Sequence, residues 1–154
     1  MFTLHGYMKF PTIKGTADSD NYKDWFHIDA YSFSIMNEPR AKLQSRNNPA
    51  NYSSIMITRT IDDASSQIMG AVDAMDIGDC TIIFSKSSSE DAHPTITINL
   101  KNAQLYTYQT EVTKEGVTTE KFSIHYGAIQ FEYSPLTNKS KQKPGHVFSR
   151  SLNK

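Results

Sequence analysis

The sequence predicts an all-β domain with one short α-helix, curved into a small β-barrel. Apolar and polar residues alternate with a period of two over most of the 154-residue chain, a pattern typical of strands with one buried face. Helical spacing occurs in one stretch only, at about 65–76. In the strand-like run at 118–133 the apolar positions change parity, which indicates a curved or closed sheet rather than a flat one.

Strands are expected wherever this alternation meets Ile, Thr, Tyr and Phe. The expected ranges are about 2–10, 24–36, 53–61, 80–86, 94–108, 118–133 and 147–152. Cys80 alternates with Ile82 and Phe84, so we expect it to be a small buried hydrophobic residue. It is the only cysteine, which rules out an intrachain disulfide.

The parity change in the run at 118–133 divides its apolar residues into two sets. They are Phe122, Ile124 and Tyr126, followed by Ile129, Phe131 and Tyr133 on the opposite face. Because side chains alternate along a strand, such a change requires an extra residue. We therefore expect a β-bulge at Gly127 and Ala128.

The expected helix has Ser65 as its N-cap and Gly78 just beyond its end. Its apolar stripe consists of Ile68, Met69, Val72 and Met75. We expect Met69 and Met75 to fill the core rather than to form a ligand-binding surface.

Charge is balanced overall but divided unevenly along the chain. Sixteen acidic residues match sixteen Lys and Arg, which argues against a general nucleic-acid or membrane binder. Residues 1–132 carry all sixteen acids and eleven bases (a net of −5), and residues 133–154 carry five bases and no acid (a net of +5). The basic tail is either a solvated terminus or an arm that meets the acidic body of a neighbouring copy.

Targeting and membrane signals are missing from the sequence. Its first residues lack the pattern of a secretory signal, and no apolar run approaches the length of a membrane span. We expect a protein made in the cytosol, with no membrane insertion, whose export would use a route independent of signal peptides.

Residues 37–52 depart from the strand pattern. The segment holds two prolines, four asparagines and one large aliphatic residue, Leu43. We expect a long exposed loop between two strands, and loops of this length in compact domains are usually functional or disordered.

No catalytic, metal or cofactor site is expected. A Ser-His-Asp set drawn from Ser123, His27 or His125, and Asp29 lacks a nucleophile elbow or oxyanion motif. The segment 18–21 (DSDN) lacks the glycine and the terminal glutamate of a calcium loop, so an Asx turn is the simpler interpretation.

Four segments, in order, resemble the Hcp (haemolysin-coregulated protein) family, the tube protein of bacterial type VI secretion. The segments are 13–15 (IKG) with 28–33 (IDAYSF), 60–65 (TIDDAS), 96–108 (ITINLKNAQLYTY), and 115–120 (EGVTTE) continuing to Tyr133. They are similar to the family's early strand pair, its "VDKAS" helix entry, its long strand and its "EGxPTE" strand.

This resemblance implies an antiparallel two-sheet β-barrel over residues 1–133, with a helix at its side. Residues 134–154 would be a basic extension that ends in a short closing strand. Six copies would form a ring, and rings would stack into a tube that carries effectors. The implied partners are further copies of the chain, the sheath, the spike and effectors, and the protein would itself be secreted.

Three sets of residues are expected to serve assembly. Ser32 and Ser34 would face the lumen while Tyr31 and Phe33 pack into the barrel. Ring or subunit contacts are expected in the loop, at Glu38, Arg40, Lys42, Leu43 and Arg46. Contacts through the basic tail are expected at Lys139, Lys141, Lys143 and Arg150.

Two other functions stay open at this point. A tail-tube protein of a phage-like contractile particle would share the fold, and neighbouring genes would separate it from a secretion protein. A monomeric β-sandwich that binds carbohydrate would need exposed coplanar aromatics, of which Trp25, Tyr106 and Tyr108 are the nearest approach.

Overall fold

The computed structural model describes residues 3–19, 21–37, 50–86, 95–135 and 146–152. Its helix, α1, spans Ser65–Ala74. The strands are β1 (His5–Lys9), β2 (Phe26–Ile28), β3 (Ala30–Ser32), β4 (Ile35–Met36), β5 (Asn51–Tyr52), β6 (Ile55–Thr60), β7 (Ile77–Ser85), β8 (Thr95–Val112), β9 (Thr118–His125), β10 (Ala128–Ser134) and β11 (His146–Ser151). The predicted all-β fold with one short helix is confirmed.

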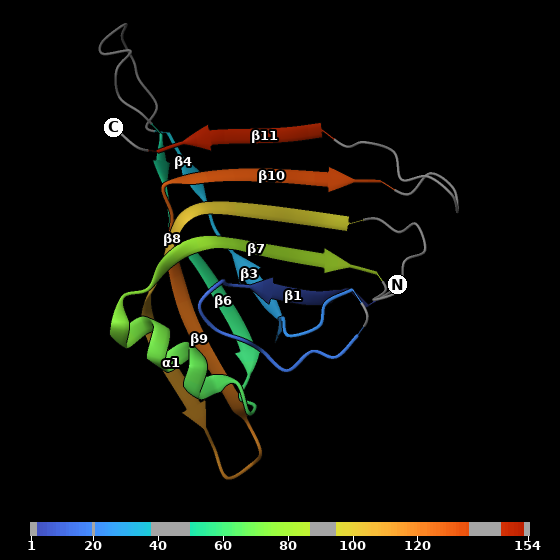
Figure 1. The fold of residues 1–154 in the computed structure, drawn as a ribbon, viewed down its shortest axis with the longest axis vertical. Coiled ribbons are helices and arrows are strands. Elements are labelled where there is room, and N and C mark those ends of the chain that lie inside the picture. The colour runs from blue at the N-terminus through green and yellow to red at the C-terminus, as the bar shows by residue number, and fades with distance from the viewer. Residues whose placement is uncertain (1–2, 20, 38–49, 87–94, 136–145, 153–154) are drawn as a thin grey trace, which may run out of the picture.

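The strands form two antiparallel groups that share β8. The first group has the order β2-β1-β7-β8-β10-β11, and the second continues from β8 through β9 and β6 to β3. In Figure 1 the strands of the first group run across the view and those of the second group cross them steeply. A separate two-stranded ribbon joins β4 to β5.

Both long strands change their buried face at the same level. On β8, Ile98 and Leu100 are buried and then Ala103 and Leu105 are buried, so the parity changes within the strand. On the neighbouring strands β9 and β10, the buried residues change from the even-numbered Ile124 to the odd-numbered Ile129, which is the same change of face. The predicted parity change is therefore confirmed, and it turns the chain from one sheet into the other.

The predicted bulge at Gly127 and Ala128 is wrong. Ile124 pairs with Leu105 and Ala128 pairs with Lys101, so three residues lie between the two pairs on each strand and neither strand has an extra one. Instead both strands bend together, and Asn102 on β8 takes a left-handed φ of 51°. Asparagine tolerates this conformation better than most residues, so the bend has a local cause.

Among the described strands, the hydrogen-bonded sheet is not closed into a complete barrel. Its path ends at β2 on one side and β3 on the other. These two strands are consecutive in the chain: β2 pairs with β1, β3 pairs with β6, and the Asp29 amide between them donates to the Thr58 carbonyl. The backbone at 26–32 thus connects the two edges around the core.

Helix α1 packs against β8 at one corner of the molecule (Figure 1), but not through the whole predicted stripe. Ile68 and Ala71 are buried and Val72 packs against the core. Met69 and Met75, predicted as core residues, are 44% and 64% exposed. The helix touches the sheets along a narrower face than its apolar residues suggest.

The ends of α1 also differ from the prediction. Its N-cap is Ala64, which makes no side-chain cap hydrogen bond, and Ser65 is already helical. At the other end Met75 adopts a left-handed φ of 57°, and its amide and that of Asp76 donate to Val72 and Ala71 carbonyls. Gly78, predicted to end the helix, lies in β7, where a Cβ would come within 2.5 Å of Pro11.

Candidate functional site

The segment 30–36, which contains β3 and β4, has packed side chains that alternate with exposed ones. Tyr31 and Phe33 pack against the hydrophobic core, and the Tyr31 ring lies 5.6 Å from that of Phe84. The predicted packing of these two rings is confirmed. Ser32 and Ser34 are exposed on the other face. Whether these two serines face a lumen depends on the assembly, so that expectation stays a prediction.

Ser32 belongs to a row of small or unbranched side chains on the outer face of the second sheet. It pairs with Met56, Met56 pairs with Ser123, and Ser123 pairs with Thr107. The hydroxyls of Thr107 and Ser123 hydrogen-bond each other. Because these side chains are short or flexible, the face has no large rigid projection along this row.

The residues on either side of the predicted contact loop form the β4–β5 ribbon. In it Ile35 pairs with Tyr52 and Met36 pairs with Asn51. The predicted contact residues Glu38, Arg40, Lys42, Leu43 and Arg46 lie outside the described residues.

Of the predicted basic-tail residues, Arg150 is described and Lys139, Lys141 and Lys143 lie outside the described residues. Arg150 is exposed on β11, and its guanidinium lies 5.9 Å from the centre of the Tyr52 ring. This cation–π contact joins the last strand to the root of the loop, two of the predicted contact regions.

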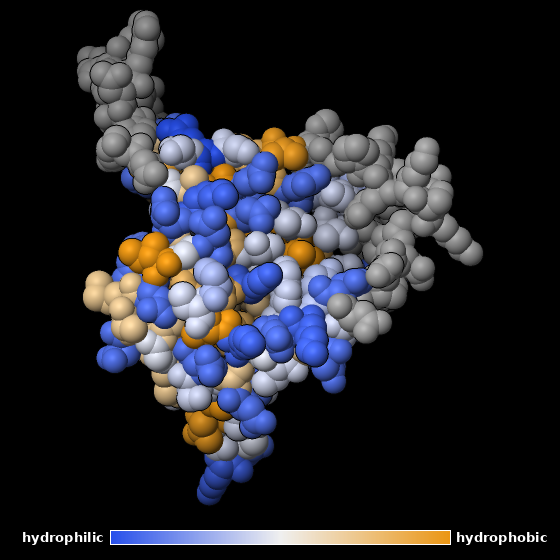
Figure 2. All heavy atoms as spheres, viewed as in Figure 1, coloured by the Kyte–Doolittle hydropathy of each residue, from blue (hydrophilic) through white to orange (hydrophobic). Residues whose placement is uncertain are grey.

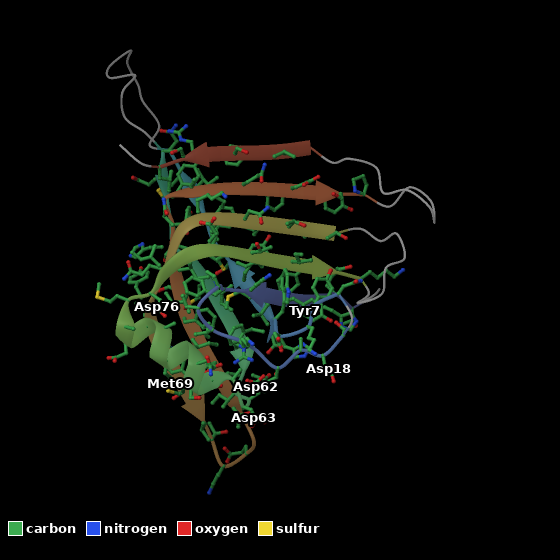
Figure 3. All side chains as sticks on the ribbon, in the orientation of Figure 1. Tyr7, Asp18, Asp62, Asp63, Met69 and Asp76 are labelled. Carbon is green, nitrogen blue, oxygen red and sulfur yellow. The ribbon has the colours of Figure 1, made fainter. Side chains whose placement is uncertain are left out.

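A buried ionic cluster, which the sequence reasoning missed, lies where β6, β9, β8 and α1 meet. The Arg59 and Glu120 side chains are fully buried and form an ion pair. Arg59 Nη2 also donates to Asp62 Oδ2 at 2.7 Å, and its Nε donates to the His27 carbonyl at 2.8 Å. In Figure 3, Asp62 lies between the end of β6 and the start of α1.

Glu120 accepts two further hydrogen bonds, from the Ser65 hydroxyl at 3.0 Å and from the Tyr108 hydroxyl. Burial, followed by the Glu120 contact, raises the pKa of Tyr108 above its ordinary value. The cluster thus fixes the start of the helix to three strands. The sequence did contain a signal for this cluster. Arg59 lies on the same strand face as the buried Ile55 and Ile57, and a charged side chain on a buried face needs a partner of opposite charge.

Asp62 is the partly exposed acid of this cluster. Burial would raise the pKa of its carboxyl, but hydrogen bonds from Arg59, the Ala64 amide and Thr16, together with the Arg59 charge, outweigh burial. The pKa of Asp62 is therefore held below its ordinary value. The carboxylate stays charged and keeps the start of α1 in place.

The residues considered for catalysis have separate partners. His125 stacks on Tyr106 with ring centres 3.5 Å apart, and His27 lies near Tyr7. Asp29 accepts a hydrogen bond from Thr60. The Ser123 hydroxyl is buried against Thr107, so the structure does not bring a Ser-His-Asp triad together from these residues.

The aromatic residues considered for carbohydrate binding are also dispersed. Trp25 packs edge-on against Tyr22, Tyr106 stacks on His125, and the Tyr108 hydroxyl bonds buried Glu120. These three side chains do not form a shared flat platform. The residue set that would have marked a carbohydrate-binding sandwich is therefore not assembled.

We next consider metal ligands, the cysteine and membrane-spanning helices among the described residues. Within these ranges no three of the His, Cys, Asp and Glu residues gather as a possible metal site. Cys80 is buried as predicted, and burial raises the pKa of its thiol to about 12, so the reactive thiolate is scarce at neutral pH. No helix in the described part of the chain is long and apolar enough to cross a membrane.

A shallow hollow of about 290 Å³ lies over β8, β10 and β11. It is lined by Asn99, Lys101, Ala128, Ile129, Gln130, Ser149, Arg150 and Ser151. Figure 2 shows that hydrophilic residues cover most of the face in this view, with hydrophobic residues scattered among them.

Comparison with known proteins identifies the fold and the family. Residues 7–133 match the family described as "Type VI secretion system effector, Hcp". No curated protein sequence matches the chain. A solved structure described as a type six secretion system protein is similar with a TM-score of 0.81 and 16% identity, over 97% of this chain and 96% of that one.

Two further solved structures have the same fold. Hcp1 from Salmonella typhimurium matches with a TM-score of 0.77 and 12% identity, over 98% of this chain and 96% of that one. A type VI secretion system effector from Yersinia pestis matches with a TM-score of 0.72 and 14% identity, over 95% and 98%. The family match covers most of the chain, and the fold agrees with it throughout. The chain therefore belongs to the Hcp family, the tube subunits of type VI secretion systems.

Proposed function

We propose that six copies of this chain close into a ring and that rings stack into the hollow inner tube of a type VI secretion system. Effectors would travel in the lumen, and the protein would leave the bacterium as part of the tube, pushed by the sheath behind a spike. Membership of the Hcp family supports this role. In this proposal the protein is structural and its chemistry is that of contact surfaces.

The observation that carries the proposal is the contrast between neighbouring side chains in the segment 30–36, which spans β3 and β4. Tyr31 and Phe33 hold the strand against the core, while Ser32 and Ser34 are exposed. Small polar side chains on a channel wall leave it unobstructed and give an apolar cargo surface little to adhere to. We therefore assign the outer face of the second sheet to the lumen and Ser32 and Ser34 to cargo contact.

The loop and the tail complete the proposal. The β4–β5 ribbon would direct residues 37–50 toward the next ring or subunit. Lys139, Lys141, Lys143 and Arg150 would meet the acidic body of an adjacent copy, a contact weakened by salt.

Labelling a cysteine at position 32 tests the assignment of the lumen. Because the Cys80 thiol is buried and has a raised pKa, Ser32→Cys adds the one accessible thiol among the described residues. The variant is coupled to a small maleimide-gold particle and imaged by electron microscopy. Gold is expected on the axis of six-fold rings.

Gln130→Cys is the matched control, because Gln130 is exposed on the outer face of the first sheet. Its gold is expected on the outer circumference. Gold from position 32 on the circumference would overturn the lumen assignment. A wild-type protein that stays monomeric over a wide range of concentration and salt, measured by light scattering, would overturn the ring itself.

A further inference from the structure

The two sheets meet along β2 and β6 without a ladder of hydrogen bonds. In the described part of the chain β2 pairs with β1, and β6 pairs with β3 and β9, although β2 lies against β6. We call the line where β2 and β6 face each other the seam. The backbone hydrogen bond described across it runs from the Asp29 amide to the Thr58 carbonyl at 2.8 Å. A closed barrel has a continuous row of such bonds, so the seam depends on other contacts as well.

Arg59 supplies the next contact across the seam. It follows Thr58 on β6, lies on the buried face of that strand and is fully buried. Its Nε donates to the His27 carbonyl on β2 at 2.8 Å, and its guanidinium lies 5.6 Å from the centre of the Phe26 ring. Because backbone groups alternate in direction along a strand, the His27 carbonyl faces the same side as the Asp29 amide. The arginine side chain therefore takes the place of the next ladder bond.

Two carboxylates orient the guanidinium toward β2. Glu120 accepts a hydrogen bond from Arg59 Nη1, and Asp62 accepts one from Nη2 at 2.7 Å, while Nε faces His27. The donors of a guanidinium lie in one plane in fixed directions, so holding two of them fixes the third. Lysine could not replace these contacts, because its three donors share one atom at the end of a flexible chain.

The strand that follows the seam carries Ser32. The chain runs from Asp29 directly into β3, which lies beside β6 in Figure 1 and ends the path of the second sheet. β3 is three residues long, and β6 is its partner in the described part of the chain. So short an edge strand has few ladder bonds of its own to hold it in place. The position of Ser32 therefore depends on how the chain is held at the seam.

We infer that Arg59 is a positioning residue. By taking the place of a ladder bond between β2 and β6, it closes the barrel at the seam and fixes where β3 presents Ser32. The lumen role of Ser32 rests on the proposed function, whereas closure of the seam does not depend on it. Without Arg59 the two sheets would still pack around one core, and residues 29–32 would open locally.

Arg59→Met/Glu120→Leu tests the inference, because it removes both members of the buried pair and such apolar replacement is often close to neutral for overall stability. Hydrogen exchange is measured residue by residue by mass spectrometry. A hydrogen bond from a charged donor is strong enough to change a local opening equilibrium about tenfold or more. We therefore expect the Asp29 amide to exchange at least about tenfold faster, while the amides of the β7–β8 ladder keep their wild-type rates.

A nitroxide spin label on Ser32→Cys provides a second measurement, at the site that Arg59 is inferred to position. The label is expected to be more mobile in the double variant than in the wild-type background. Ser65→Ala is the matched control, because it removes a hydrogen bond to Glu120 within the same cluster and leaves the bond from Arg59 Nε to His27 in place. Both measurements are expected to be unchanged in Ser65→Ala.

Three results would overturn the inference. Unchanged exchange at Asp29 in the double variant would show that Arg59 does not hold the seam. Equal acceleration at Asp29 and along the β7–β8 ladder would show that it contributes general stability only. A spin label of unchanged mobility would show that the seam does not position Ser32.

Arg59→Lys decides the matter should the double variant fail to fold, because it keeps a positive charge beside Glu120 and lacks the Nε donor. Faster exchange confined to residues 29–32 supports the inference, and wild-type exchange at Asp29 overturns it. None of these measurements requires a ring. A wild type that stays monomeric would overturn the proposed ring and the lumen role of Ser32, and the result at the seam would stand apart from it.

Discussion

Glu120→Ala provides a sharp test of the buried ionic cluster. The carboxylate receives hydrogen bonds from Arg59, Ser65 and Tyr108, and both ends of the Arg59–Glu120 pair are fully buried. Removing it leaves the Arg59 guanidinium in the core with one remaining carboxylate, Asp62, which is partly exposed. The hydroxyls of buried Ser65 and half-buried Tyr108 lose their acceptor at the same time.

The expected cost follows from what is left unpaired. Removing one member of a buried ion pair typically costs about 3–5 kcal/mol, because the other charge remains buried. Asp62 and the His27 carbonyl still hold Arg59, so we expect the lower half of this range, about 3–4 kcal/mol. For a domain of this size that is a fall in Tm of roughly 6–16 °C.

The free energy of unfolding is measured by urea titration, followed by far-ultraviolet circular dichroism and by Trp25 fluorescence. Two variants serve as controls. Arg59→Met/Glu120→Leu removes both charges and is expected to recover much of the loss, since apolar replacement of a buried pair is often close to neutral. Lys101→Ala breaks the exposed bridge to Asp79, whose side chains are 67% and 61% exposed, and no measurable change is expected.

A loss below about 1 kcal/mol for folded Glu120→Ala would refute this reasoning, because it would mean that the cluster contributes no more than a surface pair. A double variant less stable than Glu120→Ala alone would also refute the reasoning, because removing the second charge should relieve the cost of leaving Arg59 unpaired.

Two further predictions concern the ends of α1. Met75→Gly relieves a left-handed φ of 57° and should raise the free energy of unfolding by about 1 kcal/mol, whereas Met69→Gly, inside the helix, should lower it by about 1 kcal/mol; equal effects in urea titrations would contradict this. The folded-state pKa of Asp62 is lowered from 3.8, so its stabilisation is present above that pH and is lost as pH falls through the lower, folded-state pKa. Stability measured from pH 5 downward should therefore decline less steeply in Asp62→Asn than in the wild type, and identical slopes would exclude this contribution.

The strands and the helix could be predicted because their signals are local. Alternation placed β1, β6, β7, β8 and β11 close to their observed positions, and the buried parity of Cys80, Ile82 and Phe84 was confirmed. The expected single strand at 24–36 is instead β2, β3 and β4. This division reflects a change of pairing partner from β1 to β6, which no local pattern reveals.

The end of α1 shows why propensity alone was insufficient. Glycine is the usual residue for a left-handed helix end, so Gly78 was the natural prediction. The helix instead ends at Met75 in a left-handed conformation, and Gly78 lies in β7, where a Cβ would come within 2.5 Å of the Pro11 ring. A contact with a distant segment is something that a local preference cannot anticipate.

The sequence by itself determined the period of the strands, the single helix, the parity change in the last long strand and the resemblance to the Hcp family. The strand period, the helix and the parity change depend on residues close together in the chain, because side chains alternate along a strand and recur along a helix. Only the tertiary structure paired Arg59 with Glu120, sixty-one positions away, bent β8 together with its partner strands, and placed β11 beside β10. These features arise from contacts between distant segments, whose geometry is fixed only when both sheets pack around one core.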